Sequence, residues 1–314
     1  MQDRFGRTID YLRLSVTDLC DYRCLYCMPA HGVEKKRHED MLTVEECIEV
    51  ARAAVSLGIT KIRLTGGEPL VRKGIVDIVR GIRSISGLKE LDLTTNGSLL
   101  PALAAPLKDA GLDRLNISLD TLDPEKFKTI TRCGRLDDVL SGIKAAHEAG
   151  FTGIKFDTVL IGGFNTDEIG DIANLSMDHD WSMRFIELMP MGPCASWPKE
   201  RFVPASVVLQ ALPELEEIKS QGVSRLYRLP GAKGTVGLIR PLSQEFCPTC
   251  RRIRVTADGM AKGCLHAPDE IRLKGLKGEA LVEALRRAIL SKPERHHLES
   301  GPSLSGRTMN EIGG

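Results

Sequence analysis

Six short extended runs alternate with helical patterns between residues 10 and 190, and this alternation limits the fold more than any other feature of the sequence. Strands separated by helices predict βαβ units and therefore a parallel sheet with right-handed crossovers. Six strands are fewer than the eight of a closed barrel, so we expect an open, partial, TIM-like (βα)6 barrel of the α/β class. The predicted strands are Tyr11–Thr17, Lys61–Thr65, Glu90–Asn96, Arg114–Asp120, Ile154–Ile161 and Met183–Leu188, and the predicted helices cover roughly residues 43–57, 74–85, 99–110, 136–149 and 166–179.

The predicted strands are polar on one face and apolar on the other. Helices cover the outside of an α/β barrel, so we expect the apolar faces to point outward and the polar faces to line the lumen. Such a lumen is a wet cavity suited to a polar, anionic ligand. A one-sided antiparallel sheet facing water would show the same alternation, but the intervening helices make it the poorer account. The inward positions include Arg13, Lys61, Arg63, Asp92, Thr94, Asn116, Ser118, Lys155 and Asp157.

The charges of the chain nearly cancel, with 43 Lys and Arg against 42 Asp and Glu and a formal net charge of +1. Nucleic-acid-binding proteins usually carry a basic excess, so we predict no nucleic-acid partner. The charged N-terminus is unlike a signal peptide, and no apolar run is long enough to span a bilayer. We therefore expect a cytoplasmic protein with no membrane partner, whose nine cysteines include metal ligands rather than disulfides.

The pattern changes after residue 190, where four prolines crowd together between Pro190 and Pro204. Two short strands, Arg225–Leu229 and Thr235–Arg240, and a helix over residues 277–291 are predicted beyond them. The chain ends in a Gly- and Ser-rich tail. We therefore predict a barrel domain over residues 1–190 and a C-terminal α+β region over residues 191–314.

Three cysteines, Cys20, Cys24 and Cys27, directly follow the first predicted strand, at the end where barrel enzymes build their active sites. Thiolates at this density suit an iron–sulfur cluster. Three protein ligands for four irons leave one iron open, and an open position is typical of a catalytic metal. The spacing alone fits a zinc site completed by a fourth residue equally well.

A second group, Cys247, Cys250 and Cys264, predicts either a zinc site or an auxiliary cluster with its own open iron. Three further cysteines are expected to be ordinary core or surface residues. The seven histidines show no spacing typical of metal ligands, and His296 and His297 are expected in solvent. The scattered cysteines are Cys47, Cys133 and Cys194.

The first group, with Tyr26 before its last cysteine, resembles the radical S-adenosylmethionine superfamily. The second predicted strand ends in Thr65-Gly66-Gly67-Glu68-Pro69, which resembles the glycine-rich element that receives the methionine amino group in that superfamily. Glycines allow the backbone to approach a ligand closely, and the Rossmann pattern Gly-x-Gly-x-x-Gly is absent. The resemblance implies that one electron from a reduced 4Fe–4S cluster cleaves S-adenosylmethionine and frees a 5′-deoxyadenosyl radical.

Motifs along the whole chain resemble the GTP 3′,8-cyclase family of molybdenum cofactor biosynthesis. They include Leu14-Ser-Val-Thr-Asp-Leu-Cys, Thr94-Thr-Asn-Gly, Asn116-Ile-Ser-Leu-Asp, Arg184-Phe-Ile-Glu-Leu-Met-Pro, Phe246-Cys-x2-Cys-x-Arg-x-Arg and a terminal Gly-Gly. The resemblance implies two 4Fe–4S clusters at opposite ends of the barrel, with GTP between them and guanine at the open iron of the second. It implies hydrogen abstraction from the ribose 3′ carbon and attack on C8. It also implies a reduced electron donor such as flavodoxin or ferredoxin and a downstream pyranopterin synthase.

The resemblance assigns individual residues by matching motif. Gly313 and Gly314 would reach into the active site, although a two-glycine end also fits plain disorder. Arg251 and His266 depart from the family pattern, and His266 is interpreted as a neighbour of the second cysteines rather than a ligand. Residues implied to contact S-adenosylmethionine are Tyr26, Gly67, Ser118 and Met189, and those implied to hold GTP are Arg13, Lys61, Arg63, Thr94, Lys155, Arg184, Arg252 and Arg254.

Two other functions also fit parts of the sequence. Another radical enzyme with an auxiliary cluster, acting on a peptide or other small substrate, would not need a lumen rich in cations. A non-catalytic zinc-binding interaction protein would hold zinc alone. A homodimer is compatible with the sequence, which does not give the oligomeric state.

Overall fold

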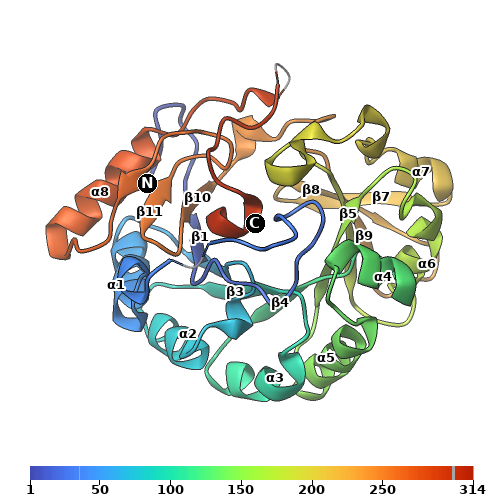
Figure 1. Ribbon diagram of the computed structural model, residues 1–314, viewed down its shortest axis with the longest axis horizontal. Coiled ribbons are helices and arrows are strands. Elements are labelled where there is room, and N and C mark those ends of the chain that lie inside the picture. The colour runs from blue at the N-terminus through green and yellow to red at the C-terminus, as the bar shows by residue number, and fades with distance from the viewer. Residues whose placement is uncertain (35, 299–300, 314) are drawn as a thin grey trace.

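One twelve-stranded sheet organises the chain in the computed structural model, which describes residues 1–34, 36–298 and 301–313. The strand order is β12-β11-β10-β1-β2-β3-β4-β5-β6-β9-β8-β7, and the eight strands from β10 to β9 run parallel to one another. Within the described ranges no pairing joins β12 to β7, so the predicted open barrel is confirmed (Figure 1). The six barrel strands are β1 (Tyr11–Ser15), β2 (Lys61–Thr65), β3 (Glu90–Thr95), β4 (Arg114–Ser118), β5 (Lys155–Leu160) and β6 (Ser182–Glu187).

Helices on the outer surface of the sheet follow the strands as predicted. Two predictions differ: α4 (Pro124–Thr131) was not expected, and the helix predicted over residues 166–179 is a 3-10 turn, Thr166–Glu168, followed by the short α6 (Ile169–Asn174). The predicted capping box is present at the start of α1. Thr43 Oγ1 accepts from the amide of Glu46 at 3.1 Å, and the Glu46 carboxylate accepts from the amide of Thr43 at 2.9 Å. The other outer helices are α1 (Val44–Ser56), α2 (Ile75–Arg83), α3 (Leu100–Asp109) and α5 (Leu136–Glu148).

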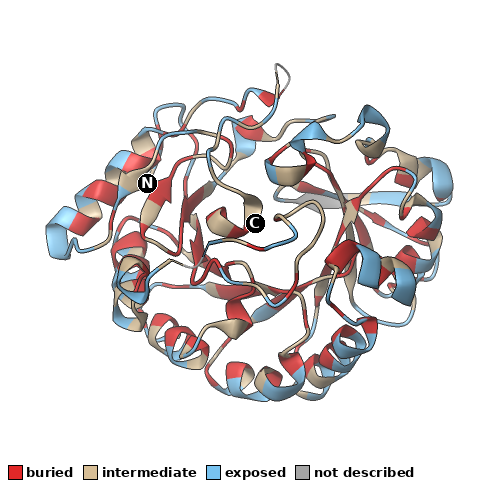
Figure 2. Ribbon diagram, viewed as in Figure 1, coloured by how far each residue is buried: buried red, intermediate tan, exposed pale blue. Residues whose placement is uncertain are grey.

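The two faces of the barrel strands divide as the alternation predicts. Leu12, Ile62 and Phe156 are fully buried in the core beneath the helices, whose inner faces are buried and outer faces exposed (Figure 2). The opposite face carries charged and polar groups that are also largely shielded from solvent, including Arg63 and Asp92. Burial of charges requires partners, so this face must be organised by ion pairs and hydrogen bonds.

The C-terminal region extends the sheet at both edges instead of packing beside it. On one side β9 (Thr235–Ile239) pairs in parallel with β6, and on the other β10 (Arg252–Val255) pairs in parallel with β1. The β10 register places Arg254 beside Arg13, so the C-terminal region contributes side chains to the same lumen. The remaining elements are α7 (Val207–Ala211), β7 (Glu216–Gln221), β8 (Ser224–Arg228), β11 (Met260–Lys262), β12 (Ile271–Arg272) and α8 (Gly278–Leu290).

The last described residues lie inside the open barrel. The last helix, α9 (Met309–Ile312), lies at the centre of the barrel in Figure 1, beside the loop that carries the first cysteines. Residue 314 lies outside the described residues. None of the helices in the described ranges has the length and apolar character needed to cross a membrane.

Candidate active site

The first cysteine loop lies directly on the glycine-rich turn after β2. Gly67 donates its amide to the carbonyl oxygen of Thr17 at 2.9 Å, and Glu68 donates to that of Leu19 at 2.8 Å. A β-carbon on Gly66 would lie 2.5 Å from Thr17 O, and one on Gly67 would lie 2.3 Å from Leu19 O. These glycines therefore allow the turn to contact the cysteine loop, a close approach between two backbones that the sequence did not reveal.

Glu68 fixes this turn to the end of β3. Its buried carboxylate accepts from the Leu70 amide at 2.9 Å, from Thr95 Oγ1 at 2.7 Å and from the Asn96 amide at 2.6 Å. Burial raises the pKa of Glu68 to about 7, against the lowering effect of those hydrogen bonds. The conformation of the turn is thus set by the hydrogen bonds of one buried carboxyl group.

The thiols of Cys20, Cys24 and Cys27 are shielded and influence one another electrostatically. Burial raises the pKa of all three, that of Cys27 to about 12 although the amide of Asn310 donates to its sulfur. They are therefore neutral thiols until a metal displaces their protons. Three sulfur donors in one short loop, at the mouth of a parallel barrel, fit an iron–sulfur cluster.

Arg132, at the end of α4, supports the same loop. It is the one non-glycine residue in the described ranges with a positive φ, at 64°. Its guanidinium donates to the carbonyl oxygens of Arg23 at 2.7 Å and Met28 at 3.0 Å, on either side of Cys24 and Cys27. Sequence reasoning missed this residue because α4 itself was not predicted.

A row of cations crosses the lumen from β10 to β2. Strand register places Arg254 beside Arg13 and Arg13 beside Arg63. Burial lowers the pKa of Arg13 to about 10, and the charges of Arg63 and Arg252 act in the same direction. Burial, with the charges of Arg13 and Arg252, also lowers the pKa of Arg254 well below its usual value. Buried like charges at this spacing favour binding of a polyanion, which would relieve their repulsion.

Two carboxylates partly neutralise this row. Asp92 is fully buried between Lys61, at 2.8 Å, and Arg63, at 2.5 Å. Burial alone would raise the pKa of Asp92, but the charges of Arg63 and Lys61 lower it to about 2. Asp157 pairs in the same way with Arg184 and accepts from Asn116 Nδ2 at 3.0 Å.

Polar groups on the lumen side remain without partners among the described residues. They include Thr65 Oγ1, Thr94 Oγ1, Asn116 Oδ1 and Arg63 Nε, all buried. Burial, followed by the charges of Arg184 and Arg63, lowers the pKa of Lys155 to about 8. Buried polar atoms are normally hydrogen-bonded, so these groups are available to bind a polar ligand or water. The lumen residues that the sequence predicted are therefore brought together.

The second cysteine group lies at the amino-terminal end of β10, since Cys247 and Cys250 precede β10 and Cys264 follows the antiparallel β11. The first group follows β1, so the two groups lie at opposite ends of the parallel strands. Arg7 donates to the carbonyl oxygen of Cys247 at 3.0 Å, and the buried Lys292 donates to the carbonyls of Arg252 and Gly263 at 3.0 and 2.7 Å. Burial raises the pKa of Cys250, but Arg252 and Lys292 overcome this and lower it to about 6. Cys250 is thus close to the thiolate form that metals bind.

His296 contradicts its prediction as a solvated residue. It is 8% exposed, its Nε2 lies 3.1 Å from Pro241 O, and its Nδ1 lies 3.4 Å from Glu245. The ligand atoms of Glu245, Cys247 and His296 all lie within 4.8 Å of one another. The second cysteine group therefore has two additional donors nearby, which the charged sequence around His296 concealed.

The other residues singled out in the sequence lie at both ends of the barrel strands. Tyr26 Oη donates to Asp120 at 2.8 Å; Ser118, the last residue of β4, and Met189, just beyond β6, are both half-buried. Arg251 forms an ion pair with Asp10 on the surface. The nitrogen Nδ1 of His266 lies 3.1 Å from Ser303 Oγ. Gly313 accepts from Arg254 Nη1 at 2.7 Å inside the barrel, whereas Gly314 lies outside the described residues.

Comparison with known proteins agrees with this geometry. The profile of the Radical SAM superfamily matches residues 14–176, and that of Molybdenum Cofactor Synthesis C matches residues 181–298. The crystal structure of Streptococcus suis SuiB bound to precursor peptide SuiA superposes with a TM-score of 0.62, covering 91% of this chain and 67% of SuiB at 14% identity. At that identity the likeness concerns the fold alone. The fold and the site thus define a radical S-adenosylmethionine enzyme, a class that implies a 4Fe–4S cluster and S-adenosylmethionine.

Relatives with higher sequence identity identify the family within this class of enzymes. A protein from Peptoclostridium acidaminophilum named GTP 3′,8-cyclase is 52% identical over 318 residues, covering 99% of this chain and 98% of that protein. A protein of the same name from Geobacter sulfurreducens is 49% identical, covering 95% of this chain and 94% of the relative. The chain belongs to the GTP 3′,8-cyclase family of molybdenum cofactor biosynthesis.

Proposed function

We propose that this chain converts GTP to (8S)-3′,8-cyclo-7,8-dihydroguanosine 5′-triphosphate in the barrel lumen, between two iron–sulfur clusters. The main observation in support of a GTP site is the buried row of Arg254, Arg13 and Arg63. An anionic ligand would relieve the repulsion between these charges. Guanidinium groups bind phosphate oxygens through paired hydrogen bonds, which suits a triphosphate. The proposed GTP-binding residues are Arg13, Lys61, Arg63, Thr94, Lys155, Arg184, Arg252 and Arg254.

Cys20, Cys24 and Cys27 would hold the first cluster, and Tyr26, Gly67, Ser118 and Met189 would contact S-adenosylmethionine beside it. When bound, the cluster and S-adenosylmethionine would together supply the one-electron reductive cleavage that starts the radical chemistry. The protein binds and orients the substrate and excludes water. Asp120, which accepts from Tyr26, helps to fix this side of the site.

Cys247, Cys250 and Cys264 would hold a second 4Fe–4S cluster. The low pKa of Cys250 and the cation Arg252 beside it favour thiolate ligands here. Zinc remains the competing metal, since Glu245 and His296 lie close enough to Cys247 to complete a four-ligand site.

Metal analysis of anaerobically purified protein separates these alternatives. We expect about eight iron atoms with matching sulfide per chain, falling to about four when Cys247 and Cys250 are replaced by Ala. Zinc at the second site, or zinc alone throughout, would contradict the two-cluster proposal.

Binding of GTP tests the substrate independently. Arg63→Ala and Arg254→Ala should impair GTP turnover while iron content stays at the wild-type level. Arg80→Ala is the control, because Arg80 forms an exposed pair with Asp77 on α2. If GTP does not bind the reconstituted wild-type protein, or if a peptide binds in its place, the substrate assignment is wrong.

The proposal extends to the cellular location, the partner proteins and the domain organisation of the chain. We propose a cytoplasmic enzyme that takes electrons from a reduced donor such as flavodoxin or ferredoxin and supplies a downstream pyranopterin synthase, with a homodimer as the candidate assembly. We also propose the division into a barrel over residues 1–190 and a C-terminal region over residues 191–314.

A further inference from the structure

The last part of the chain crosses the mouth of the barrel as a strap, which we define as residues 301–313 and call the C-terminal strap. Ser303 donates its amide to the carbonyl oxygen of Pro190 at 3.0 Å, beyond the end of β6. Further along, Asn310 Nδ2 donates to Asp18 O at 3.1 Å, and Gly313 accepts from Arg254. The C-terminal strap therefore contacts both the first cysteine loop and the lumen cations.

Polar contacts hold the C-terminal strap in place. Among the described residues, none in 301–313 belongs to either hydrophobic core cluster, and Leu304 is 60% exposed, although Ile312 near the end of the strap is fully buried. A segment with few apolar contacts can open without global unfolding. Apart from Ile312, the position of the strap therefore depends on its hydrogen bonds and ion pairs.

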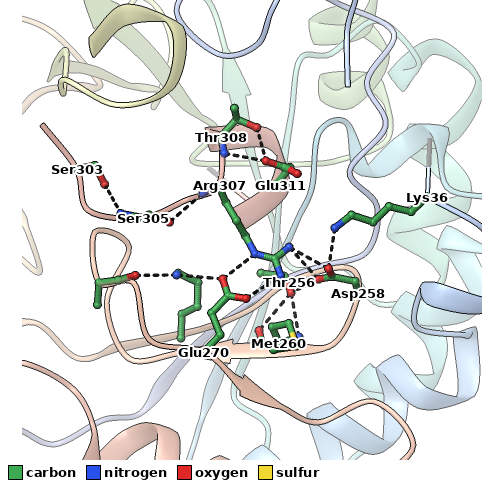
Figure 3. Close-up of polar contacts among 12 residues, drawn as sticks. Lys36, Thr256, Asp258, Met260, Glu270, Ser303, Ser305, Arg307, Thr308 and Glu311 are labelled. Carbon is green, nitrogen blue, oxygen red and sulfur yellow. Dashed lines mark hydrogen bonds and ion pairs between the residues drawn. The ribbon is translucent and has the colours of Figure 1, made fainter. Parts of the chain in front are cut away.

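Arg307 makes the most extensive of these polar contacts (Figure 3). Its Nε and Nη2 donate to the two carboxylate oxygens of Glu270 at 2.6 and 2.8 Å, and its Nη1 donates to both oxygens of Asp258 at 3.1 and 2.9 Å. All three side chains are less than one fifth exposed. Forked contacts of this kind, partly shielded from water, are stronger and more specific than an exposed ion pair.

Two lysines also contact the carboxylates that bind Arg307. Lys36, from the segment that follows the first cysteine loop, contacts Asp258 at 2.7 Å, and the buried Lys262 contacts Glu270 at 3.2 Å. Burial would raise the pKa of Asp258, but hydrogen bonds from Lys36, Thr256 and Arg307 lower it to about 2. The two carboxylates are therefore charged at neutral pH and ready to receive Arg307.

The position of Arg307 in the chain connects this network to the cluster site. The next residue, Thr308, is the N-cap of α9, and Thr308 and Glu311 form a capping box. Asn310, on that capped turn, donates its amide to the sulfur of Cys27. A rotation of the turn at Arg307 would move Asn310 and Gly313 together.

We propose that Arg307 is a positioning residue. By bridging Asp258 and Glu270, it holds α9 so that Asn310 lies against Cys27 and Gly313 lies against Arg254. This role rests on the proposed function, since it takes Cys27 and Arg254 as parts of the active site. Arg307 itself contacts neither the cysteine sulfurs nor the lumen arginines in any described contact.

Amide hydrogen exchange on the anaerobically reconstituted holoenzyme tests the role directly. In Arg307→Gln, amides of the C-terminal strap should exchange at least about tenfold faster, as expected when charge-assisted hydrogen bonds that hold a local structure are lost. Amides of β1–β6 and the iron content should match the wild type. Arg286→Gln is the matched control, because Arg286 forms an exposed pair with Glu283 on α8.

Reaction coupling provides the functional readout. In Arg307→Gln we expect more 5′-deoxyadenosine per molecule of GTP consumed than in the wild type, because cleavage of S-adenosylmethionine continues beside a displaced strap. Arg307→Lys keeps the charge but not the fork, and should fall between the two proteins in both exchange and coupling.

Wild-type exchange of the C-terminal strap in Arg307→Gln would overturn the proposal. So would faster exchange spread equally over the barrel strands, which would mark a general loss of stability. If Arg307→Gln does not fold, Arg307→Lys carries the same test. Failure of wild-type protein to bind GTP would refute the proposed substrate but would leave the exchange result interpretable.

Discussion

Arg254 donates a hydrogen bond of 2.7 Å to the carbonyl oxygen of Gly313, so a strand of the barrel and the end of the chain meet inside the lumen. The same arginine lies beside Arg13 in strand register. Gly313 therefore lies beside the cations proposed to bind the triphosphate, and a change at Gly313 should alter the site without changing its charge.

Gly313→Ala tests how closely the chain end must approach. Gly313 has a φ of 78°, and an added β-carbon would lie 2.3 Å from Thr65 Oγ1. We expect GTP turnover to fall by about tenfold or more, because the strain of a left-handed residue, about 1–2 kcal/mol, is joined by a steric clash. Turnover under anaerobic conditions is the measurement.

Gly275→Ala is the control for this experiment. Gly275 has nearly the same φ, 83°, but no atom within 4 Å of an added β-carbon. It shares the backbone strain without the clash, so its turnover should stay near that of the wild type. Equal losses in the two variants would attribute the effect to backbone strain alone.

Asp92→Asn tests the internal counter-ion. The change leaves the buried Arg63 without its carboxylate, whereas the partly exposed Lys61 keeps Glu90 at 2.9 Å, and breaking a buried pair destabilises proteins by about 3–5 kcal/mol. We expect a loss of that order in the free energy of unfolding, and a larger thermal stabilisation by added GTP than in the wild type, because the triphosphate replaces the missing negative charge.

Asp77→Asn provides the matched comparison for Asp92→Asn. Asp77 pairs with Arg80 on the surface of α2, where both side chains are more than half exposed. Its loss should cost no more than about 1 kcal/mol. Similar unfolding midpoints for the two variants would show that Asp92 has no special role.

The six barrel strands could be predicted from the sequence because apolar residues recur at every second position along them, the period of a β-strand. It also predicted which side chains line the lumen, since alternation assigns Arg13 and Arg63 to one face. Pairing of β10 with β1 was not predictable, because four residues beside a cysteine group carry no signal of their distant partner. The burial of His296 depends on Pro241 and Glu245, which a local pattern does not bring together.

The ion pairs inside the site were harder to predict than its residues. Asp92 and Asp157 were expected to point inward, but nothing in the alternation says that one pairs with Lys61 and Arg63 and the other with Arg184. Strand register and side-chain length decide those pairs. The network around Arg307 likewise joins three segments that are far apart in the sequence, namely Lys36, residues 258–270 and Arg307 itself.

The pH dependence of GTP binding should reflect Lys155. Its pKa is lowered to about 8, first by burial and then by Arg184, Arg63 and Lys61, while Asp92 acts in the opposite direction. Below pH 8 the ammonium group is charged and can bind phosphate, and above pH 8 it loses its proton. Affinity for GTP should therefore fall as pH rises through 8, with a further fall near pH 10 from Arg13.

Calorimetry of GTP binding across this pH range measures the effect. Lys155→Met should bind more weakly at pH 7 and should lose the inflection near pH 8. Lys89→Met, a change at an exposed residue, should keep the wild-type profile. An unchanged inflection in Lys155→Met would assign the titration to another group.

Arg132 offers a test of how the first cysteine loop is held. Its guanidinium donates to carbonyl oxygens on both sides of Cys24 and Cys27, while its backbone adopts the left-handed region that non-glycine residues avoid. Residues that orient metal ligands typically contribute a factor of about 10 to 100 in metal affinity. Arg132→Leu should therefore lose iron to a chelator at least about tenfold faster than the wild type.

Arg132→Gly separates the two features of this residue, because glycine relieves the backbone strain and removes the same hydrogen bonds. If the hydrogen bonds hold the loop, Arg132→Gly should lose iron as readily as Arg132→Leu, even where its free energy of unfolding is higher. Arg135→Leu, three residues on and largely exposed, should retain iron like the wild type. Wild-type iron retention in Arg132→Gly would mean that the cysteine loop keeps its conformation without the guanidinium, and that the strained backbone has some other cause.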